Sequence, residues 1–125
     1  MAQISRQEFE KALVALEEAF AECAKQAPGS KAYKLLRDAT IQRFEFSVEI
    51  AWKVSAKALG SPSTSAKPVL REMLRAGMIS DIDRWFDFVE ARNKSSHTYD
   101  ENIAAEVFSA IGPFIAAARE LFSKL

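Results

Sequence analysis

The chain has 125 residues, 49% hydrophobic and 27% charged, which suits one domain with one core and leaves no room for separate catalytic and substrate domains. Its 17 basic and 17 acidic residues cancel, which argues against strong non-specific binding to nucleic acid. The charge is uneven, because residues 31–75 carry 9 basic and 4 acidic side chains. We therefore expect a single domain over residues 1–125, with the basic middle segment as the docking face for a partner.

No feature of the sequence indicates a secreted or membrane protein. The start, Met1–Arg6, lacks the apolar run of a signal peptide, and no segment approaches the roughly twenty apolar residues that cross a bilayer. Cys23 is the only cysteine, so an intrachain disulfide is excluded, and we interpret it as a small apolar residue on a helix face. We expect a cytoplasmic protein without membrane contact.

The first half predicts two long amphipathic helices. Ser5 and Glu8 form a capping box with Ile4 as a staple residue, and apolar residues then recur at spacings of three and four. The second helix is predicted from Lys31 to Leu59, with Gly60 as its C-terminal cap.

The second half predicts a short helix and two longer ones. Pro68 lies in the first turn of the short helix, Ser80 or Asp81 caps the next, and the last begins near Asp100. The Gly-Pro pair at 112–113 predicts a kink or break in this last helix. Since no stretch alternates with period two, the predicted fold is all-α, an antiparallel four-helix bundle with one additional short helix.

The end of the fourth predicted helix is its most unusual part. On a straight helix with about 100° per residue, Asn93, Ser96 and His97 continue the apolar stripe, while Arg92 and Tyr99 lie on one flank. Polar groups on a core-facing stripe are costly unless they are satisfied. Three ordinary explanations apply: the bundle opens to water, the groups cap the helix, or His97 is a hydrogen-bonded core histidine. The functional alternative is a polar pocket or interface patch for a phosphate-bearing ligand.

Arg92 and His97 are five residues apart, which is about 140° on a regular helix. They reach one small ligand only if the weak helix formers Ser95–Thr98 let the helix loosen, or if two copies meet across a two-fold axis, for example through the fourth helix. Other site classes lack their residues: one histidine excludes a paired Glu-x-x-His metal site, and there is no phosphate-binding loop. We expect no metal and no cofactor.

The spacing Arg92-x4-His97-x-Tyr99 resembles the signature of the HEPN superfamily of helical domains. The longer string from Arg92 to Glu101 resembles one branch of it, the nucleotidyltransferase substrate-binding proteins. Other segments resemble the same branch, namely 42–53 and 68–79. The likeness therefore extends over nearly the whole chain.

This resemblance implies a helical subunit that binds the substrate of a minimal nucleotidyltransferase encoded nearby, with the catalytic Gly-Ser and Asp-x-Asp features in that partner. In related pairs the bundle is a metal-independent ribonuclease toxin, active as a homodimer, and the nucleotidyltransferase is its antitoxin. Carried onto this chain, Arg92 holds the scissile phosphate, and His97 is the general acid and base at the ribose 2′-hydroxyl. Asn93 and Ser96 support them by hydrogen bonds, and Tyr99 is the residue that the partner modifies.

Three hypotheses follow. The chain is a substrate-binding partner subunit, or it is a ribonuclease toxin whose ligand is RNA, or it is a structural bundle whose polar helix end is only a cap. The first is the main interpretation, and it is compatible with the second because a toxin can also be a subunit.

Overall fold

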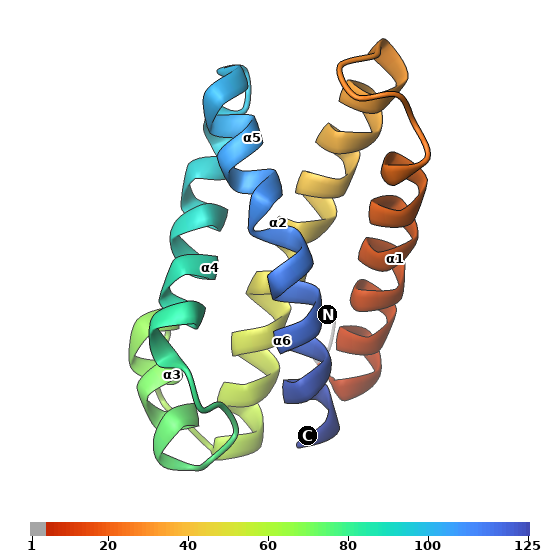
Figure 1. Ribbon diagram of the computed structural model, residues 1–125. Coiled ribbons are helices and arrows are strands. Elements are labelled where there is room, and N and C mark those ends of the chain that lie inside the picture. The colour runs from red at the N-terminus through yellow and green to blue at the C-terminus, as the bar shows by residue number, and fades with distance from the viewer. Residues whose placement is uncertain (1–4) are drawn as a thin grey trace.

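The computed structural model describes residues 5–125, in which all regular structure is helical. Successive long helices run in opposite directions: α1 lies beside α2, α4 and the α5–α6 pair complete the bundle, and short α3 packs against α2 and α4 (Figure 1). The bounds are α1 Arg6–Ala24, α2 Lys31–Leu59, α3 Ala66–Arg75, α4 Ile82–Lys94, the 3-10 turn η1 Ser95–His97, α5 Glu101–Ser109 and α6 Ile111–Ser123. The predicted antiparallel four-helix bundle with a short extra helix is confirmed.

Local capping explains where these helices begin and end. The Ser5 hydroxyl accepts a hydrogen bond from the Glu8 backbone N–H at 3.2 Å, and the Asp81 carboxylate caps α4 in the same way. Gly60 ends α2 in the left-handed conformation, with φ 64°, where a side chain would be strained. The predicted staple residue Ile4 lies outside the described residues.

Pro113 explains the division of the last helix into two. Proline has no N–H, and its ring clashes with the carbonyl four residues earlier, which here is that of Ser109. Ser109 is the last residue of α5, and α6 begins after a single intervening residue, Ala110. The predicted interruption is therefore a break.

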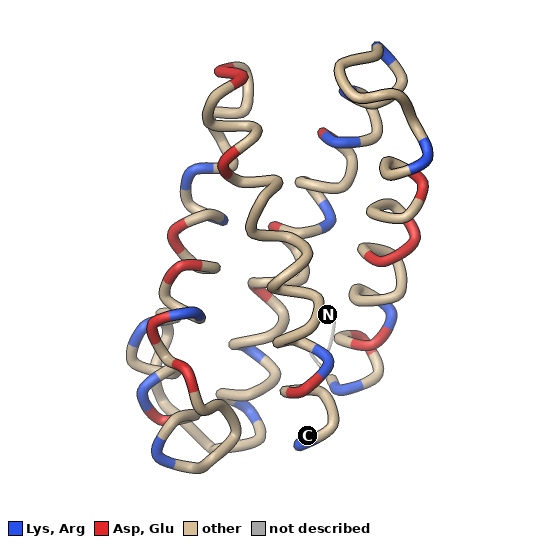
Figure 2. The backbone as a smooth tube through the Cα atoms, viewed as in Figure 1, with Lys and Arg blue, Asp and Glu red and all other residues tan. Residues whose placement is uncertain are grey.

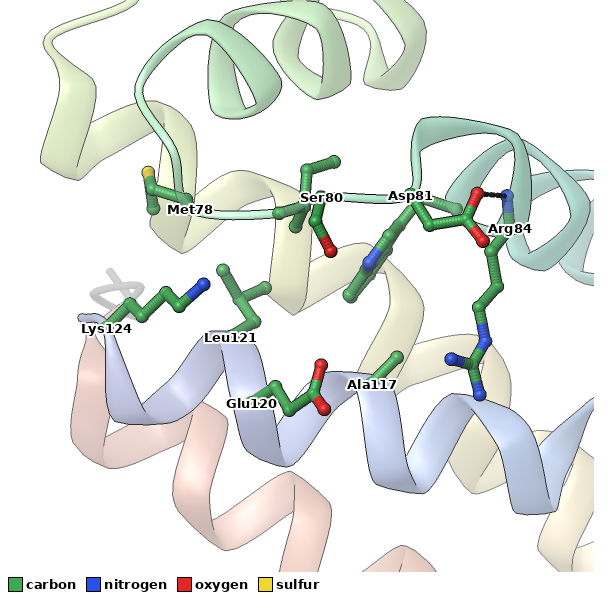
Figure 3. Close-up of a pocket in the computed structure, with 10 residues that line it drawn as sticks. Met78, Ser80, Asp81, Arg84, Ala117, Glu120, Leu121 and Lys124 are labelled. Carbon is green, nitrogen blue, oxygen red and sulfur yellow. Dashed lines mark hydrogen bonds between the residues drawn. The ribbon is translucent and has the colours of Figure 1, made fainter.

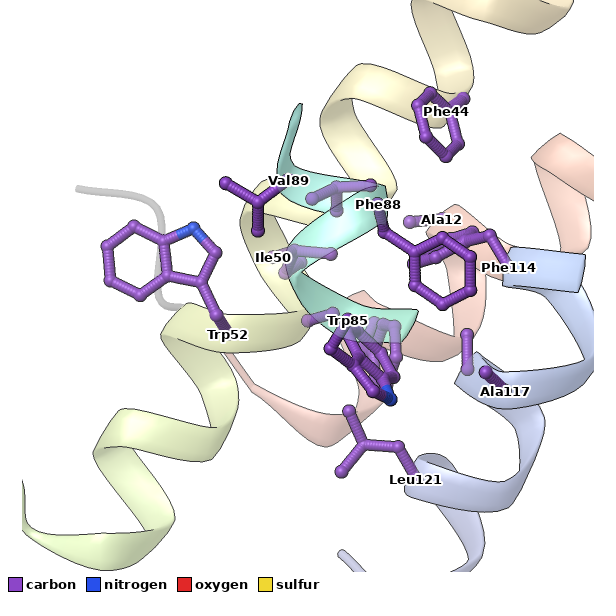
Figure 4. Packing of buried hydrophobic residues seen from close by; sticks show 14 of the residues in the cluster. Ala12, Phe44, Ile50, Trp52, Trp85, Phe88, Val89, Phe114, Ala117 and Leu121 are labelled. Carbon is purple, nitrogen blue, oxygen red and sulfur yellow. The ribbon is translucent and has the colours of Figure 1, made fainter. Parts of the chain in front are cut away.

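An aromatic cluster in the middle of the bundle joins α2, α4 and α6 (Figure 4). The ring of Phe114 meets Phe44 and Phe88 at centroid distances of 5.3 Å and Trp85 at 5.8 Å, all edge to face. Edge-to-face packing is the favoured geometry for aromatic pairs and adds to the gain from burying the rings. The cluster therefore decides which side of α4 faces inward.

The outer surface carries charges of both signs along the helices (Figure 2). Five large apolar or aromatic side chains within residues 5–125 are also exposed, and the most accessible are Tyr99 at 84%, Leu35 at 64% and Phe46 at 59%. Within residues 5–125, no helix has the length and apolar character that a membrane span requires.

Candidate functional site at the end of α4

The inward face of α4 differs from the predicted one. The predicted apolar stripe consists of Ile82, Trp85, Phe86 and Val89. Trp85 and Val89 are buried as predicted, but Ile82 and Phe86 are only half-buried, and Phe88, outside the predicted stripe, is buried in their place. Phe86 has a neighbour on α3 instead, where the Arg71 guanidinium lies 5.7 Å from its ring centre. Helix α4 is therefore rotated about its own axis relative to the orientation predicted from the sequence. The reason is that α3 covers one side of its apolar surface.

This rotation changes which motif residues face the bundle. The aromatic stripe of α4 continues into Arg92, which is half-buried, and Ser95, which is buried, while Asn93, Ser96 and His97 are exposed. The prediction that these last three continue the core-facing stripe is therefore wrong. It also follows that His97 is not a buried core histidine.

The regular α-helix ends within the motif, where its weak helix formers lie, but the chain winds more tightly there. After α4 ends, η1 takes up the tighter 3-10 winding, and two serine hydroxyls donate to carbonyls three residues earlier: Ser95 to Arg92 at 2.5 Å and Ser96 to Asn93 at 3.5 Å. The capping explanation thus holds for these two serines. Because a 3-10 helix has three residues per turn, this tighter winding turns His97 farther from Arg92 around the helix axis instead of toward it.

The structure brings together two of the motif side chains. The rings of His97 and Tyr99 meet edge to face, with centroids 5.9 Å apart and planes at 80°, and both residues are exposed. Arg92 instead faces α2, where its Nε lies 2.9 Å from Oε1 of Glu49. Among the described residues, Arg92 and His97 share no hydrogen bond or ring contact: Arg92 lies against α2, and His97 contacts Tyr99 at the surface.

A second ion pair joins α2 to the segment that follows the motif. Arg37 is buried, and its terminal nitrogens donate to both carboxylate oxygens of Glu101, the first residue of α5, at 2.8 and 3.2 Å. These hydrogen bonds raise the pKa of Arg37 and lower the pKa of Glu101. The pairs Arg92–Glu49 and Glu101–Arg37 therefore bracket the motif and tie both its ends to α2.

Sequence reasoning overlooked these two α2 residues. Arg37 lies on the inward-facing side of α2, at helical spacing from Tyr33, Thr40 and Phe44. A charged residue at such a position is rarely buried without an ion-pair partner, so the sequence could have predicted that Arg37 has one. Glu49 gives no such signal, because its partner becomes adjacent only when α4 packs against α2.

An open depression lies beside Arg92, between α2, α4 and the start of α3. Its walls include Glu49 and Trp52 from α2, Asn93 and Val89 from α4, and residues 65–67 from α3. This depression is lined by the motif residue Asn93 and by Glu49, the ion-pair partner of Arg92.

A second pocket lies at the other end of α4 (Figure 3). Asp81, Arg84, Glu120 and Lys124 surround it, and the Arg84 backbone N–H is bonded to the Asp81 carboxylate. None of residues 92–99 lines this pocket, so it is separate from the motif.

Cys23 is not available as a nucleophile. Its side chain is fully buried, its Sγ donates to the Tyr33 carbonyl at 3.6 Å, and burial raises the pKa of the thiol. This agrees with the interpretation of Cys23 as a packed residue on a helix face. Within residues 5–125, no three His, Cys, Asp or Glu side chains gather in the manner of metal ligands.

Comparison with known proteins identifies the family. Residues 5–125 match the family model described as nucleotidyltransferase substrate binding protein like. The chain belongs to this family. The resemblance that rests on the Arg92-x4-His97-x-Tyr99 string and its branch-specific neighbours is thereby confirmed.

Relatives of this nucleotidyltransferase substrate-binding-like chain include the probable ribonuclease HepT of Haemophilus influenzae strain Rd. The two are 33% identical over 93 residues, which are 68% of this chain and 64% of HepT, so the match spans slightly less than two thirds of that relative.

Two solved structures share the fold of this family member. One is a Haemophilus influenzae protein described as having the fold of a substrate binding domain of a nucleotidyltransferase, with TM-score 0.83, 27% identity and coverage of 94% of this chain and 96% of that one. The other comes from Thermus thermophilus, with TM-score 0.80, 28% identity and coverage of 93% and 97%. The chain therefore has the fold of a nucleotidyltransferase substrate-binding domain.

The Arg37–Glu101 pair predicts a pH dependence of stability. Because the pKa of Glu101 is lower in the folded state, the pair stabilises the fold above the ordinary glutamate pKa, and this contribution is lost as pH falls through the folded-state value. Denaturant unfolding between pH 7 and pH 3 should show wild type losing more free energy of unfolding than Glu101→Gln, whose amide does not titrate. Equal losses in the two proteins would contradict the assignment.

Proposed function

We propose that this chain is the helical substrate-binding subunit of a two-component minimal nucleotidyltransferase system. The observation that carries the proposal is the family match over residues 5–125, together with the shared fold of the Haemophilus protein described as a nucleotidyltransferase substrate-binding domain. The net positive segment 31–75, which forms α2 and α3, is the proposed docking face for the catalytic partner.

The letters of nucleotidyltransferase catalytic motifs occur in the chain but have structural roles. Gly-Ser occurs twice: Ser30 of Gly29-Ser30 is the N-cap of α2, and Gly60 of Gly60-Ser61 is its left-handed C-cap. The Asp-x-Asp string at 81–83 is the capped start of α4, where Asp81 accepts from a backbone N–H. These roles support a subunit that leaves nucleotidyl transfer to its partner.

The proposal predicts a stable complex. Co-expression with the minimal nucleotidyltransferase encoded beside it should give one complex that survives affinity and size-exclusion chromatography at micromolar concentration. An unrelated nucleotidyltransferase of similar size is the control. Failure of the two chains to co-purify would count against the partner role.

A second function, a ribonuclease toxin silenced by the same partner, is favoured by a specific observation. His97 and Tyr99 are exposed and in contact, Arg92 is half-exposed beside an open depression, and a 33% identical relative is named a probable ribonuclease. In this proposal Asn93 and Ser96, both exposed, give supporting hydrogen bonds. The exposed phenol of Tyr99 is accessible for modification by the partner, and a bulky anion there would obstruct the adjacent imidazole.

The proposed cleavage requires no metal. The His97 imidazole takes the proton of a ribose 2′-hydroxyl, whose oxygen attacks the neighbouring phosphorus while the bond to the 5′-oxygen breaks. The proton that the imidazole took up returns through water to the leaving 5′-oxygen, so the products carry a 2′,3′-cyclic phosphate and a 5′-hydroxyl and His97 is again neutral. The Arg92 guanidinium binds the phosphate oxygens and stabilises the negative charge that develops on them.

This mechanism predicts metal-independent RNA cleavage by the isolated chain. Cleavage of a labelled RNA should persist in EDTA, leave 2′,3′-cyclic phosphate ends, and fall by about 100-fold or more in His97→Ala. Expression of wild type without the partner should arrest growth, and expression of the variant should not. Equal cleavage by His97→Ala would refute the assigned role.

We further propose that the working form is a homodimer, because Arg92 lies against α2 while the exposed His97 contacts Tyr99, and a second copy would bring another Arg92 and His97 to the same cleft. An unpartnered stripe on α2 supports this: Leu35 and Phe46 are 64% and 59% exposed, and they lie eleven residues, about three turns, apart on one face. Ala39 and Gln42, also exposed, lie between them. A second copy packed antiparallel places each Leu35 against the other chain's Phe46.

Charge and position also support a second copy as the occupant of the stripe. Lys31 and Lys34 lie at one end of it and Glu45 at the other, so reversing the second helix brings opposite charges together at both ends. The motif is bracketed by the α2 residues Glu49 and Arg37, which span the same stretch of helix. A two-fold axis through the middle of the stripe therefore places the motifs of the two copies at the same height along the paired α2 helices.

The stripe predicts how the dimer is broken. Light scattering after size exclusion should give a dimer for wild type and a monomer for Phe46→Glu, because a buried carboxylate opposes association. Val14→Glu, a matched change at a 41% exposed position on α1, should remain dimeric. A wild type that is monomeric at about 100 micromolar, well above the micromolar range of ordinary protein association, would overturn the proposed assembly, and so would a Phe46→Glu variant that remains dimeric.

A further inference from the structure

The Arg92 side chain has one charged partner within the described residues, Glu49 of α2. The Arg92 Nε lies 2.9 Å from Glu49 Oε1, and the two side chains are 35% and 31% exposed, so the pair is partly screened from water. The N–H at Nε is buried but is not aimed closely enough at the carboxylate to count as a hydrogen bond. The attraction between the two groups is therefore mainly ionic.

Glu49 is itself held from its other side. Its Oε2 lies 3.5 Å from the Lys53 ammonium, one turn farther along α2, and that ammonium lies 5.6 Å from the centre of the Trp52 ring. A glutamate followed four residues later by a lysine is the favourable order on a helix. Lys53, Glu49 and Arg92 thus form a row of alternating charge beside the open depression that Glu49, Trp52 and Asn93 line.

The geometry of the guanidinium decides which nitrogens of Arg92 remain available to a phosphate. A guanidinium is planar and has five N–H donors, and the edge formed by its two terminal nitrogens matches two oxygens of a phosphate. Glu49 approaches Arg92 at Nε, and no hydrogen bond within the described residues uses the two terminal nitrogens of Arg92. The contact therefore fixes the side chain from one side and leaves the phosphate-binding edge free.

We infer that Glu49 is the positioning residue for Arg92, and that it orients the guanidinium so that its terminal edge binds a phosphodiester of the RNA substrate. The inference rests on the proposed ribonuclease function. Loss of Glu49 would leave a long side chain with several rotatable bonds and no fixed direction. Misplacement of a reacting group by about 1 Å costs on the order of 100-fold in rate.

A simpler explanation is that the Arg92–Glu49 pair only joins two helices. A second ion pair in the chain serves as the control for this explanation. Glu17 and Arg119 link α1 to α6, their side chains are 34% and 36% exposed, and Arg119 Nε donates to Glu17 Oε2 at 2.9 Å. This pair has the same residue types and similar burial, but it is bidentate, because Arg119 Nη2 also donates to Glu17 Oε1 at 2.5 Å. Neither residue lies in the motif or lines the depression beside Arg92.

The experiment compares Glu49→Gln, Glu49→Asp and Glu17→Gln in steady-state cleavage of a fluorescent oligoribonucleotide, with thermal unfolding recorded for each. Glu49→Gln should lower kcat by about 10- to 100-fold with KM within about threefold of wild type. Glu49→Asp, which keeps the charge, should recover part of the loss. Glu17→Gln should have a similar effect on the unfolding temperature and leave kcat within about twofold.

The outcomes separate this inference from the proposed function. If Arg92→Ala is inactive while Glu49→Gln cleaves like wild type, the positioning role is wrong and the ribonuclease function stands. If wild type itself does not cleave RNA, the ribonuclease function fails, and the arginine Nε–H signals in a nitrogen–proton NMR spectrum decide the positioning role. The Arg92 signal must then shift in Glu49→Gln and not in Glu17→Gln, and an unchanged signal overturns the inference.

Discussion

The packing of α4 against Phe114 is the constraint on which the rest of the candidate site depends. Trp85 and Phe88 meet the Phe114 ring edge to face, and this fixes the rotation of α4 about its own axis. Helical periodicity then carries the inward direction to Arg92, so its guanidinium reaches α2, while His97 is left outside. The separation of the two motif residues is thus a consequence of core packing elsewhere on the same helix.

Two ion pairs from α2 then hold the ends of the motif. Arg37 is buried and bonded to Glu101, and Glu49 faces Arg92, with the 3-10 turn between these two attachments. A buried arginine is costly unless its donors are satisfied, so the Arg37 pair constrains where α5 begins. Arg92 is held against the bundle while His97 is exposed. In the proposed dimer, two antiparallel copies that share the α2 stripe would place the two motifs at the same height along the paired helices. The substrate-binding and ribonuclease proposals therefore concern one region of the bundle.

The sequence by itself determined the elements and the identity of the motif. Capping chemistry located the start of α1 at Ser5 and the end of α2 at Gly60, and the missing N–H of Pro113 divided the last helix, because these effects act over a few residues. The spacing from Arg92 to Tyr99 was also visible in the sequence and indicated the family that the comparison then confirmed.

Only the tertiary structure decided which motif residues face the bundle and what holds them. Ile82, Phe86 and Phe88 are all apolar, so the sequence could not tell which of them α3 covers and which enters the core, and the error in that choice turned the predicted stripe onto the wrong motif residues. Glu49 lies far before Arg92 in the chain and is an ordinary helix residue until α2 and α4 pack together. Local rules fix where a helix begins and ends, whereas its rotation is set by contacts with residues that are distant in the chain.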